Sequence, residues 1–187
     1  MVKPIIFDRK NLNLESGELM IEDFTSSTRT FNEIFESVSE YTRPAICFNF
    51  LSPTCIRYRN SDVTEMFPHR LAVFRSLQSK WNSVCPEEMR LALTDDDIER
   101  YMVERPDAKT YRTHAVMVNT VFDVNKGHPR PIFKQGFTGR CTYTLTRDAP
   151  VSVKNAVLIL AQFAEYSGVG SAVGRGCGWV EVRVEEV

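Results

Sequence analysis

The sequence lacks the features that mark membrane and secreted proteins. No stretch approaches eighteen consecutive apolar residues, which excludes a transmembrane helix. The first residues, MVKPIIFDRKN, have neither the long apolar run nor the small-residue cleavage site of a secretory signal. The five cysteines are odd in number and form no CxxC pair, which disfavours a disulfide framework or a zinc site. We therefore expect a cytoplasmic protein with no membrane partner.

The chain also lacks a strong excess of either charge. Its net charge is −1, so any nucleic acid must be held by a local patch and not by a field over the whole molecule. Such a patch is present, because residues 126–154 contain six basic side chains and Asp148 as their only acid, whereas residues 87–107 are acidic. The apolar share of 43% and the charged share of 25% are those of an ordinary globular protein. The length of 187 residues suits one compact domain with an added segment.

Hydrophobic periodicity predicts the elements of one α+β domain. From residue 45 the predicted order is strand, helix, strand, strand, helix and strand. This order is typical of a ferredoxin-like βαββαβ domain, the fold of RNA-recognition modules. We assign residues 44–187 to this domain and residues 1–43 to an N-terminal extension with a short strand and a helix. The predicted elements are a strand at 19–21, a helix at 30–41, a strand at 45–58 broken at Ser52-Pro53, a helix at 67–82, strands at 111–122 and 136–145 around a turn at 125–131, a helix from Ser152 to Gly168 and a strand at 179–184.

Glycine is scarce except in one segment, residues 167–178, which reads SGVGSAVGRGCG. The segment follows a helix and precedes a strand, so it is neither a dinucleotide-binding fingerprint nor a Walker loop. Glycine leaves main-chain amides open to close approach, and we expect these amides to contact phosphate together with Arg175. The alternative, a tight connection needed only for the fold, stays open with equal weight. The candidate residues here are Gly168, Gly170, Gly174, Arg175, Gly176 and Gly178.

Four segments in order resemble one known family. The helix LILAQFAEY followed by SGVG and GRGCG resembles the glycine-rich C-terminal motif of the CRISPR repeat-processing endoribonucleases, the sixth Cas protein family. GFTGRCTYTL (residues 136–145) is similar to the family's glycine-phenylalanine strand, and FLSPTCIRY (residues 50–58) to its first C-terminal strand. FPHRLAVFRSLQSKWN (residues 67–82) resembles the helix that follows. The resemblance covers residues 45–184, roughly the C-terminal half of such a protein.

The resemblance implies an RNA-cleaving function. Members of the family carry two ferredoxin-like domains in tandem, bind the repeat of a CRISPR transcript and cut it without a metal or another cofactor. In this reaction the 2′-hydroxyl attacks the neighbouring phosphate, and the histidine commonly used lies in the N-terminal domain. Residues 1–43 are too few for a complete first domain and are interpreted as a remnant of one, so the catalytic histidine is not carried over to this chain.

Three histidines are present, and only one lies beside plausible phosphate ligands. His69 starts a helix and His114 lies inside a strand, so a structural role is favoured for both. His128 lies in the basic turn KGHPR and is a weak catalytic candidate. The acidic run Asp95-Asp96-Asp97 lacks the spacing of a calcium loop, and a solvated acidic loop or a helix start is the favoured interpretation.

A basic hairpin is the second candidate RNA-binding element. Lys126, Arg130, Lys134 and Arg140 follow the turn at residues 125–131 and the second strand, and they would hold an RNA backbone by charge. A solvated strand face is the alternative. Phe137 and Tyr143 on the same strand are weaker candidates for stacking on bases.

The sequence thus predicts CRISPR repeat RNA as the partner, as part of a metal-independent endoribonuclease. Two rivals remain. One is a non-catalytic RNA-binding subunit that joins other subunits of a CRISPR effector complex, since such subunits resemble this fold. The other is a protein-docking module, and an incomplete first domain would favour a homodimer.

Overall fold

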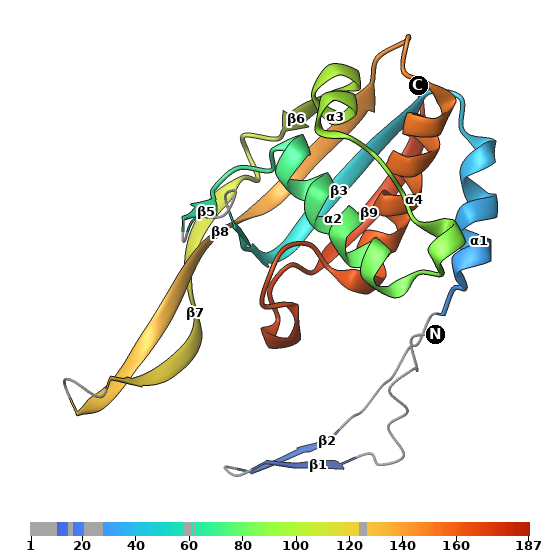
Figure 1. Ribbon diagram of the computed structural model, residues 1–187. Coiled ribbons are helices and arrows are strands. Elements are labelled where there is room, and N and C mark those ends of the chain that lie inside the picture. The colour runs from blue at the N-terminus through green and yellow to red at the C-terminus, as the bar shows by residue number, and fades with distance from the viewer. Residues whose placement is uncertain (1–10, 15–16, 21–27, 58–60, 62, 124–126) are drawn as a thin grey trace.

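The computed structural model describes residues 11–14, 17–20, 28–57, 61, 63–123 and 127–187, and for residues 11–14 and 17–20 the backbone alone (Figure 1). The helices are α1 (Phe31–Ser37), α2 (Arg70–Val84), α3 (Asp95–Tyr101) and α4 (Val151–Ser167), with 3₁₀ turns η1 (Val38–Glu40), η2 (Glu87–Met89) and η3 (Val173–Arg175). The strands are β1 (Asn11–Leu14), β2 (Gly17–Met20), β3 (Pro44–Thr54), β4 (Ile56–Arg57), β5 (Thr64–Glu65), β6 (Met102–Pro106), β7 (Arg112–Asp123), β8 (His128–Leu145) and β9 (Val180–Glu186).

The main sheet has the strand order β6-β8-β3-β9, and β7 pairs with β8 beyond β6. Every pair is antiparallel, and β6 and β7 follow one another along the same side of β8. If β6 and β7 are counted as one interrupted strand, the domain has four strands, which in chain order are β3, β6/β7, β8 and β9. Their order across the sheet is then 2-3-1-4, which is the ferredoxin-like arrangement. Helices α2 and α4 lie side by side over one face of the sheet (Figure 1). The predicted βαββαβ fold is therefore confirmed.

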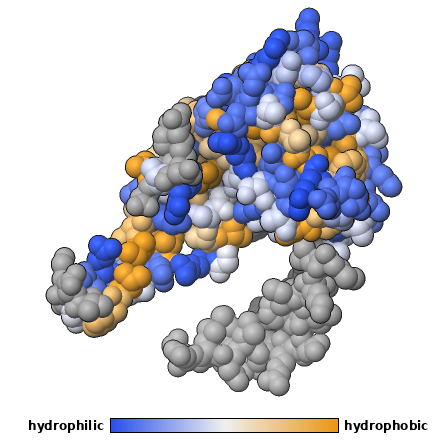
Figure 2. Space-filling view, viewed as in Figure 1, coloured by the Kyte–Doolittle hydropathy of each residue, from blue (hydrophilic) through white to orange (hydrophobic). Residues whose placement is uncertain are grey.

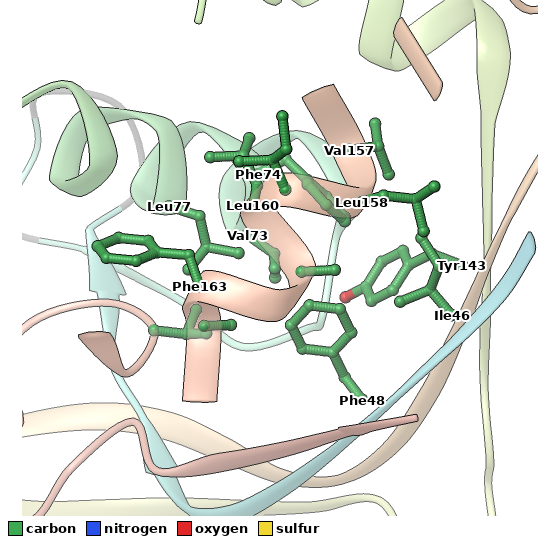
Figure 3. Packing of buried hydrophobic residues seen from close by; sticks show 14 of the residues in the cluster. Ile46, Phe48, Val73, Phe74, Leu77, Tyr143, Val157, Leu158, Leu160 and Phe163 are labelled. Atoms are coloured by element: carbon green, nitrogen blue, oxygen red, sulfur yellow. The ribbon is translucent and has the colours of Figure 1, made fainter. Parts of the chain in front are cut away.

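Alternation along β3 separates the covered face of the sheet from the open one. Ile46, Phe48 and Phe50 are buried under the helices, whereas Cys47 and Asn49 between them are half-exposed on the opposite face. Phe48 meets the rings of Phe74 and Tyr143 edge to face, with ring centroids 6.0 Å and 5.3 Å away (Figure 3). The Tyr143 hydroxyl keeps a partner inside this core by donating to the Pro68 carbonyl at 2.8 Å.

Helix α4 buries an apolar face in the main core. Its members Val153, Val157, Leu160, Ala161 and Ala164 are all buried. The predicted helix start is wrong, however: Pro150 is the N-cap, and Ser152 makes no capping bond. The helix ends at Ser167, and Gly168 follows it with φ of +61° and ψ of 171°, a positive φ that glycine adopts readily.

The acidic stretch holds more regular structure than its composition indicates. Besides η2 and α3 it contains the edge strand β6, which the sequence analysis missed because MVERP carries two charges and a proline. Between β6 and β7 the chain turns away from β8, and the Asp107 amide donates to the Arg140 carbonyl at 2.9 Å across the gap. Strand β8 also begins earlier than predicted, at His128, which shortens the hairpin turn.

The helix α1 belongs to the same core as the sheet. Thr30 and Glu33 form a capping box at its start, and Ile34 is buried with Val38 of η1 in the main cluster. The Gln162 side chain of α4 accepts from the Ser37 hydroxyl at 2.8 Å. The division of the chain after residue 43 stays a prediction. In the part of the chain that is described, no helix is long and apolar enough to cross a membrane.

Candidate nucleic-acid interface

The glycine-rich loop between α4 and β9 is closed on itself at its base. The Val169 amide donates to the Gly178 carbonyl at 2.8 Å, and the Gly178 amide donates to the Pro53 carbonyl of β3 at 3.1 Å. Ser171 pairs with Cys55 as an isolated β-bridge, so the loop is tied to the end of β3 on two sides. The tip of the loop is the single turn η3, where Gly174, Arg175 and Gly176 are exposed.

Most of the loop amides are used inside the protein. The amides of Gly168, Gly170, Gly176 and Gly178 donate to the Ala164 carbonyl, the Ser76 hydroxyl, the Val173 carbonyl and the Pro53 carbonyl. Each of these four amides thus has an acceptor inside the protein and is not bare, whereas the sequence led us to expect bare amides. Gly174 differs, since its amide donates to no group within the described chain. Contact between the loop and RNA stays a prediction.

Two of these glycines are required for close packing. At Gly178, φ is +74° and a Cβ would lie 2.0 Å from the Val169 carbonyl oxygen. At Gly170, φ is +78° and a Cβ would lie 2.6 Å from the Cys55 carbonyl oxygen. Any L-residue with a side chain would clash with the backbone at both positions. The structural alternative left open by the sequence therefore accounts for this part of the motif.

The C-terminal half of α2 supports the start of the loop, through residues that the sequence analysis missed. The Lys80 ammonium donates to the carbonyls of Ser167 and Gly168, at 3.1 Å and 2.8 Å. It thereby caps the carbonyl end of α4. Burial lowers the pKa of Lys80 to about 8, because the charged form is poorly solvated there. No sequence signal places a lysine of one helix at the end of another.

The loop and the basic hairpin meet at one junction. The Lys134 ammonium of β8 donates to the Ser171 hydroxyl at 2.9 Å, and the Arg175 guanidinium donates to the Val118 carbonyl of β7. Beneath these bonds Cys55, Val118 and Cys177 form a small buried cluster of their own. Two elements that the sequence analysis considered separately thus form one surface, which we call the hairpin–loop junction and define by Lys134, Ser171, Arg175 and Val118.

The cysteines at this junction, Cys55 and Cys177, are buried as small apolar groups. Burial raises the pKa of the Cys55 thiol to about 11, with the neighbouring Cys177 adding to the effect. Burial likewise raises the pKa of Cys141 to about 12. The Cys55 and Cys141 thiols stay protonated at neutral pH, which removes them as nucleophiles.

The hairpin of β7 and β8 extends well beyond the helical layer (Figure 1). Of its predicted cations, Arg130 and Arg140 are exposed and Lys134 is partly covered, while Lys126 lies outside the described residues. The register places Met117 opposite Phe133 and Phe122 opposite Pro129, and the side chains of Met117, Phe122 and Phe133 are 59%, 64% and 56% exposed. In Figure 2 an apolar stripe runs along the hairpin. Arg130 and Lys134 alternate with these aromatic positions and lie on the other face.

The exposed aromatic residues differ from those expected. Phe137 and Tyr143 have no exposed surface and pack in the core, so neither can stack on a base. Phe122 and Phe133 take their place as candidates, because they lie on the same hairpin and their rings face solvent.

The three histidines lie in separate surroundings. His69 is the N-cap of α2, with its Nε2 atom 3.6 Å from the Glu104 carboxylate, which also binds Arg70. The His114 Nε2 atom lies 2.8 Å from the Thr138 hydroxyl inside the hairpin ladder. His128 is exposed at the far end of the hairpin, with its Nδ1 atom 3.0 Å from the Pro129 carbonyl oxygen. It stays a weak catalytic candidate.

The acidic run has the structural role predicted for it. Asp97 caps α3 together with Thr94, and these hydrogen bonds lower the pKa of its carboxyl group. Asp95 pairs with Arg75 at 2.8 Å. Among the described residues no three histidine, cysteine, aspartate or glutamate side chains are grouped to hold a metal ion.

The fold and the site together define a ferredoxin-like domain of the RNA-recognition type, with a glycine-rich loop after its last helix and a long hairpin beside it. The family model for the CRISPR-associated endoribonuclease Cas6 matches residues 48–180. The chain therefore belongs to the Cas6 family. A comparison with curated proteins found no match.

Solved Cas6 structures share the fold. Thermus thermophilus Cas6 (TTHB231) superposes with a TM-score of 0.60 at 21% identity, over 80% of this chain and 57% of that one. The Cas6 (TTHA0078) product complex gives a TM-score of 0.60 at 21% identity, over 94% and 68%. A substrate mimic complex of the same Cas6 gives 0.54 at 22% identity, over 90% and 64%. This chain thus spans less than two thirds of the length of the T. thermophilus protein.

Proposed function

We propose that this chain binds the repeat of a CRISPR transcript and takes part in its cleavage by a metal-independent endoribonuclease. The observation that carries the proposal is the hairpin–loop junction, where a basic hairpin is joined to the glycine-rich loop in a member of the Cas6 family. The solved relatives support an RNA partner, since two of them are described as product and substrate mimic complexes.

The chemistry of the junction suits an RNA backbone. Arg130 and Lys134 lie on one face of the hairpin, and Arg175 extends from the loop toward the same strands. Guanidinium and ammonium groups attract phosphates along a strand without reading the bases. The closed base of the loop keeps Arg175 and the open amide of Gly174 in place, so the glycines contribute mainly by rigidity.

In the proposed reaction the ribose 2′-hydroxyl attacks the adjacent phosphorus atom. The bond from phosphorus to the 5′-oxygen of the next nucleotide breaks, and the 2′-proton leaves to a base while the 5′-oxygen gains a proton. The products are a 2′,3′-cyclic phosphate and a 5′-hydroxyl. A group near neutral pKa would have to lie at the cut site. Of the described residues we retain only His128 as a weak candidate for this role.

A cleavage assay tests the proposal directly. The chain is incubated with end-labelled repeat RNA in the presence of a chelator. Cleavage that leaves a cyclic phosphate supports the endoribonuclease. Tight binding without cleavage supports the rival function of an RNA-binding subunit in a CRISPR effector complex. Absence of binding overturns both the endoribonuclease and the RNA-binding subunit, and leaves the protein-docking module. Measuring the mass of the chain in solution at the same concentrations tests the proposed homodimer.

Charge reversal tests which surface binds the RNA. We expect the double variant Arg130→Glu and Arg140→Glu to weaken binding to repeat RNA and to reduce its salt dependence. The slope of log affinity against log salt should fall by about one unit for each phosphate that the variant no longer binds. Arg90→Glu is the matched control, because Arg90 lies in the turn after η2 and not on the hairpin. Unchanged affinity and slope in the double variant would remove the hairpin from the interface.

A further inference from the structure

A second cluster of cations surrounds a cavity at the other end of β8. The cavity has a volume of about 440 Å³ and lies where β3 begins and where β8 leads into α4. Its charged lining residues are Arg43, Arg105, Arg147 and Lys154. From Lys134 to Thr144 the strand covers ten residues, which places this cavity roughly 30 Å from the hairpin–loop junction.

The charged side chains that line this cavity are all positive. No aspartate or glutamate side chain belongs to it, and Arg43, Arg105 and Arg147 form no ion pair with any described residue. Two acids of β9 follow in the strand register, Glu185 opposite Ala45 and Glu186 opposite Pro44. The Glu186 carboxylate already accepts from the amides of Thr42 and Arg43. In a chain with almost equal numbers of acids and bases, four cations around one cavity repel one another unless an anion joins them.

The available donors suit phosphate groups. The three guanidinium groups are exposed and can each form paired hydrogen bonds to phosphate oxygens. Lys154 already donates to the Tyr41 carbonyl at 2.8 Å, which fixes its position at the start of α4. The hydroxyl of Thr144 adds a neutral donor in the lining.

The open face of the sheet connects the two basic regions. Arg105 pairs with Thr142 of β8, and paired residues point to the same face of a sheet. Its neighbours Glu104 and Pro106 point to the covered face, so Arg105 lies on the open face with Thr142 and Thr144. Arg140, opposite Asn49 of β3, is exposed on this open face between the hairpin and the cavity. Cations therefore follow β8 from the hairpin to the cavity.

We propose that the cavity formed by Arg43, Arg105, Arg147 and Lys154 binds phosphate groups of the repeat RNA at a distance from the hairpin–loop junction. This inference rests on the proposed function and adds a second contact, which a single stretch of RNA reaches across the open face. The same donors could take a free phosphate compound, and the test separates these two sources.

The test compares the wild-type chain with the double variant Arg105→Ala and Arg147→Ala. Both side chains are exposed, so melting followed by circular dichroism should be unchanged. We expect binding of the full repeat RNA to weaken by about tenfold for each arginine. The slope of log affinity against log salt should fall by about 1.4, or 0.7 for each single-strand phosphate. Arg90→Ala is the control, since Arg90 is exposed in the turn after η2 and does not line the cavity.

RNA length decides whether the contact is separate from the hairpin. Repeat RNA is shortened stepwise from either end, and one shortened form should bind the wild type and the double variant equally. If the variant binds every length more weakly by the same factor, the arginines act only through general charge and the inference is wrong. The inference is equally wrong if the variant binds the full repeat as the wild type does.

A titration with inorganic phosphate keeps the test independent of the proposed function. We expect phosphate to shift the amide resonances of residues 42–43 and 144–147 in the wild type but not in the double variant. Phosphate shifts combined with unchanged RNA binding would assign the cavity to a free phosphate compound and overturn the RNA assignment. If the wild type bound no repeat RNA at all, the proposed function would fail, and absence of phosphate shifts would then reject the cavity as well.

Discussion

The glycine-rich loop and the hairpin lie against each other but are built in opposite ways. The loop is folded inward, with four of its five glycine amides bonded within the protein and two glycines packed against backbone oxygen atoms. The hairpin is turned outward, with large apolar side chains and Arg130 exposed to solvent. A glycine-rich motif can therefore serve mainly to hold a surface in place, while ordinary strand residues provide the surface itself.

The largest expected effect is in the loop. Gly178→Ala should destabilise the fold by about 3 kcal/mol or more, because its Cβ would overlap the Val169 carbonyl oxygen and the residue would keep a positive φ. Gly174→Ala is the matched control, since its Cβ would meet no atom within 4 Å and should change stability by less than about 0.5 kcal/mol. Urea unfolding measures both, and equal stabilities would contradict the view of the loop as a packed support.

On the hairpin, the expected effect is on RNA binding and not on stability. The double variant Phe122→Ala and Phe133→Ala should weaken binding by about 1–3 kcal/mol for each base that stacks on these rings. Unfolding should be almost unchanged, because both side chains are more than half exposed. Val84→Ala, at an exposed apolar residue that ends α2, is the control. Unchanged affinity for repeat RNA would show that the apolar face of the hairpin does not contact the RNA.

The junction between the two regions can be measured as a coupling. In a double-mutant cycle, Lys134→Met and Ser171→Ala should be non-additive by about 0.5–1.5 kcal/mol in the free energy of unfolding, because each removes one side of the same hydrogen bond. Lys134→Met combined with Ser39→Ala should be additive, since Ser39 lies in η1 and bonds to the Glu36 carbonyl. Additivity in the first pair would show that loop and hairpin are energetically independent.

The smallest expected effect is the pH dependence contributed by Lys80. Its pKa is about 8 in the folded chain and returns to the ordinary 10.5 on unfolding. Between pH 8 and pH 10.5 the Lys80 amine is protonated in the unfolded chain but largely neutral in the folded one, so raising the pH stabilises the folded state. Below pH 8 the amine is charged in both states, and the full cost of burying that charge lowers the stability. The stability of the wild type relative to Lys80→Met should therefore increase between about pH 8 and about pH 10. Lys109→Met, which alters an exposed lysine, should show no such trend.

The order of elements could be predicted because each long element carries a clear period. The apolar residues of α4 recur at helical spacing, and those of β3 alternate. Strand β6 could not be predicted in this way, since only its pairing with β8 makes MVERP extended. The early start of β8 was hidden by Pro129 and Pro131, which are tolerated because this part of the strand pairs on one side only, with β7.

The candidate site could be predicted as a set of segments but not as a surface. Arg130, Lys134 and Arg175 were found from charge and motif, yet the bond from Lys134 to Ser171 depends on tertiary packing. The amides of the loop were expected to be open because glycine has no side chain to cover them. The sequence does not show that tertiary packing brings acceptors such as the Ser76 hydroxyl and the Pro53 carbonyl to these amides. Lys80 carried no signal, because a single lysine in a helix is usually a solvated side chain.

Strand β8 carries residues of both proposed contact regions, Arg130 and Lys134 near one end and Thr144 near the other. The number of residues of β8 between the two regions therefore fixes both their distance and the faces on which their side chains lie. Deleting one residue in the middle of β8 would shorten the interval by only about 3.3 Å, but it would turn every side chain beyond that point to the opposite side. Lengthening the hairpin tip would leave the interval intact, so variation in length should be tolerated at the tip and not at the centre of the strand.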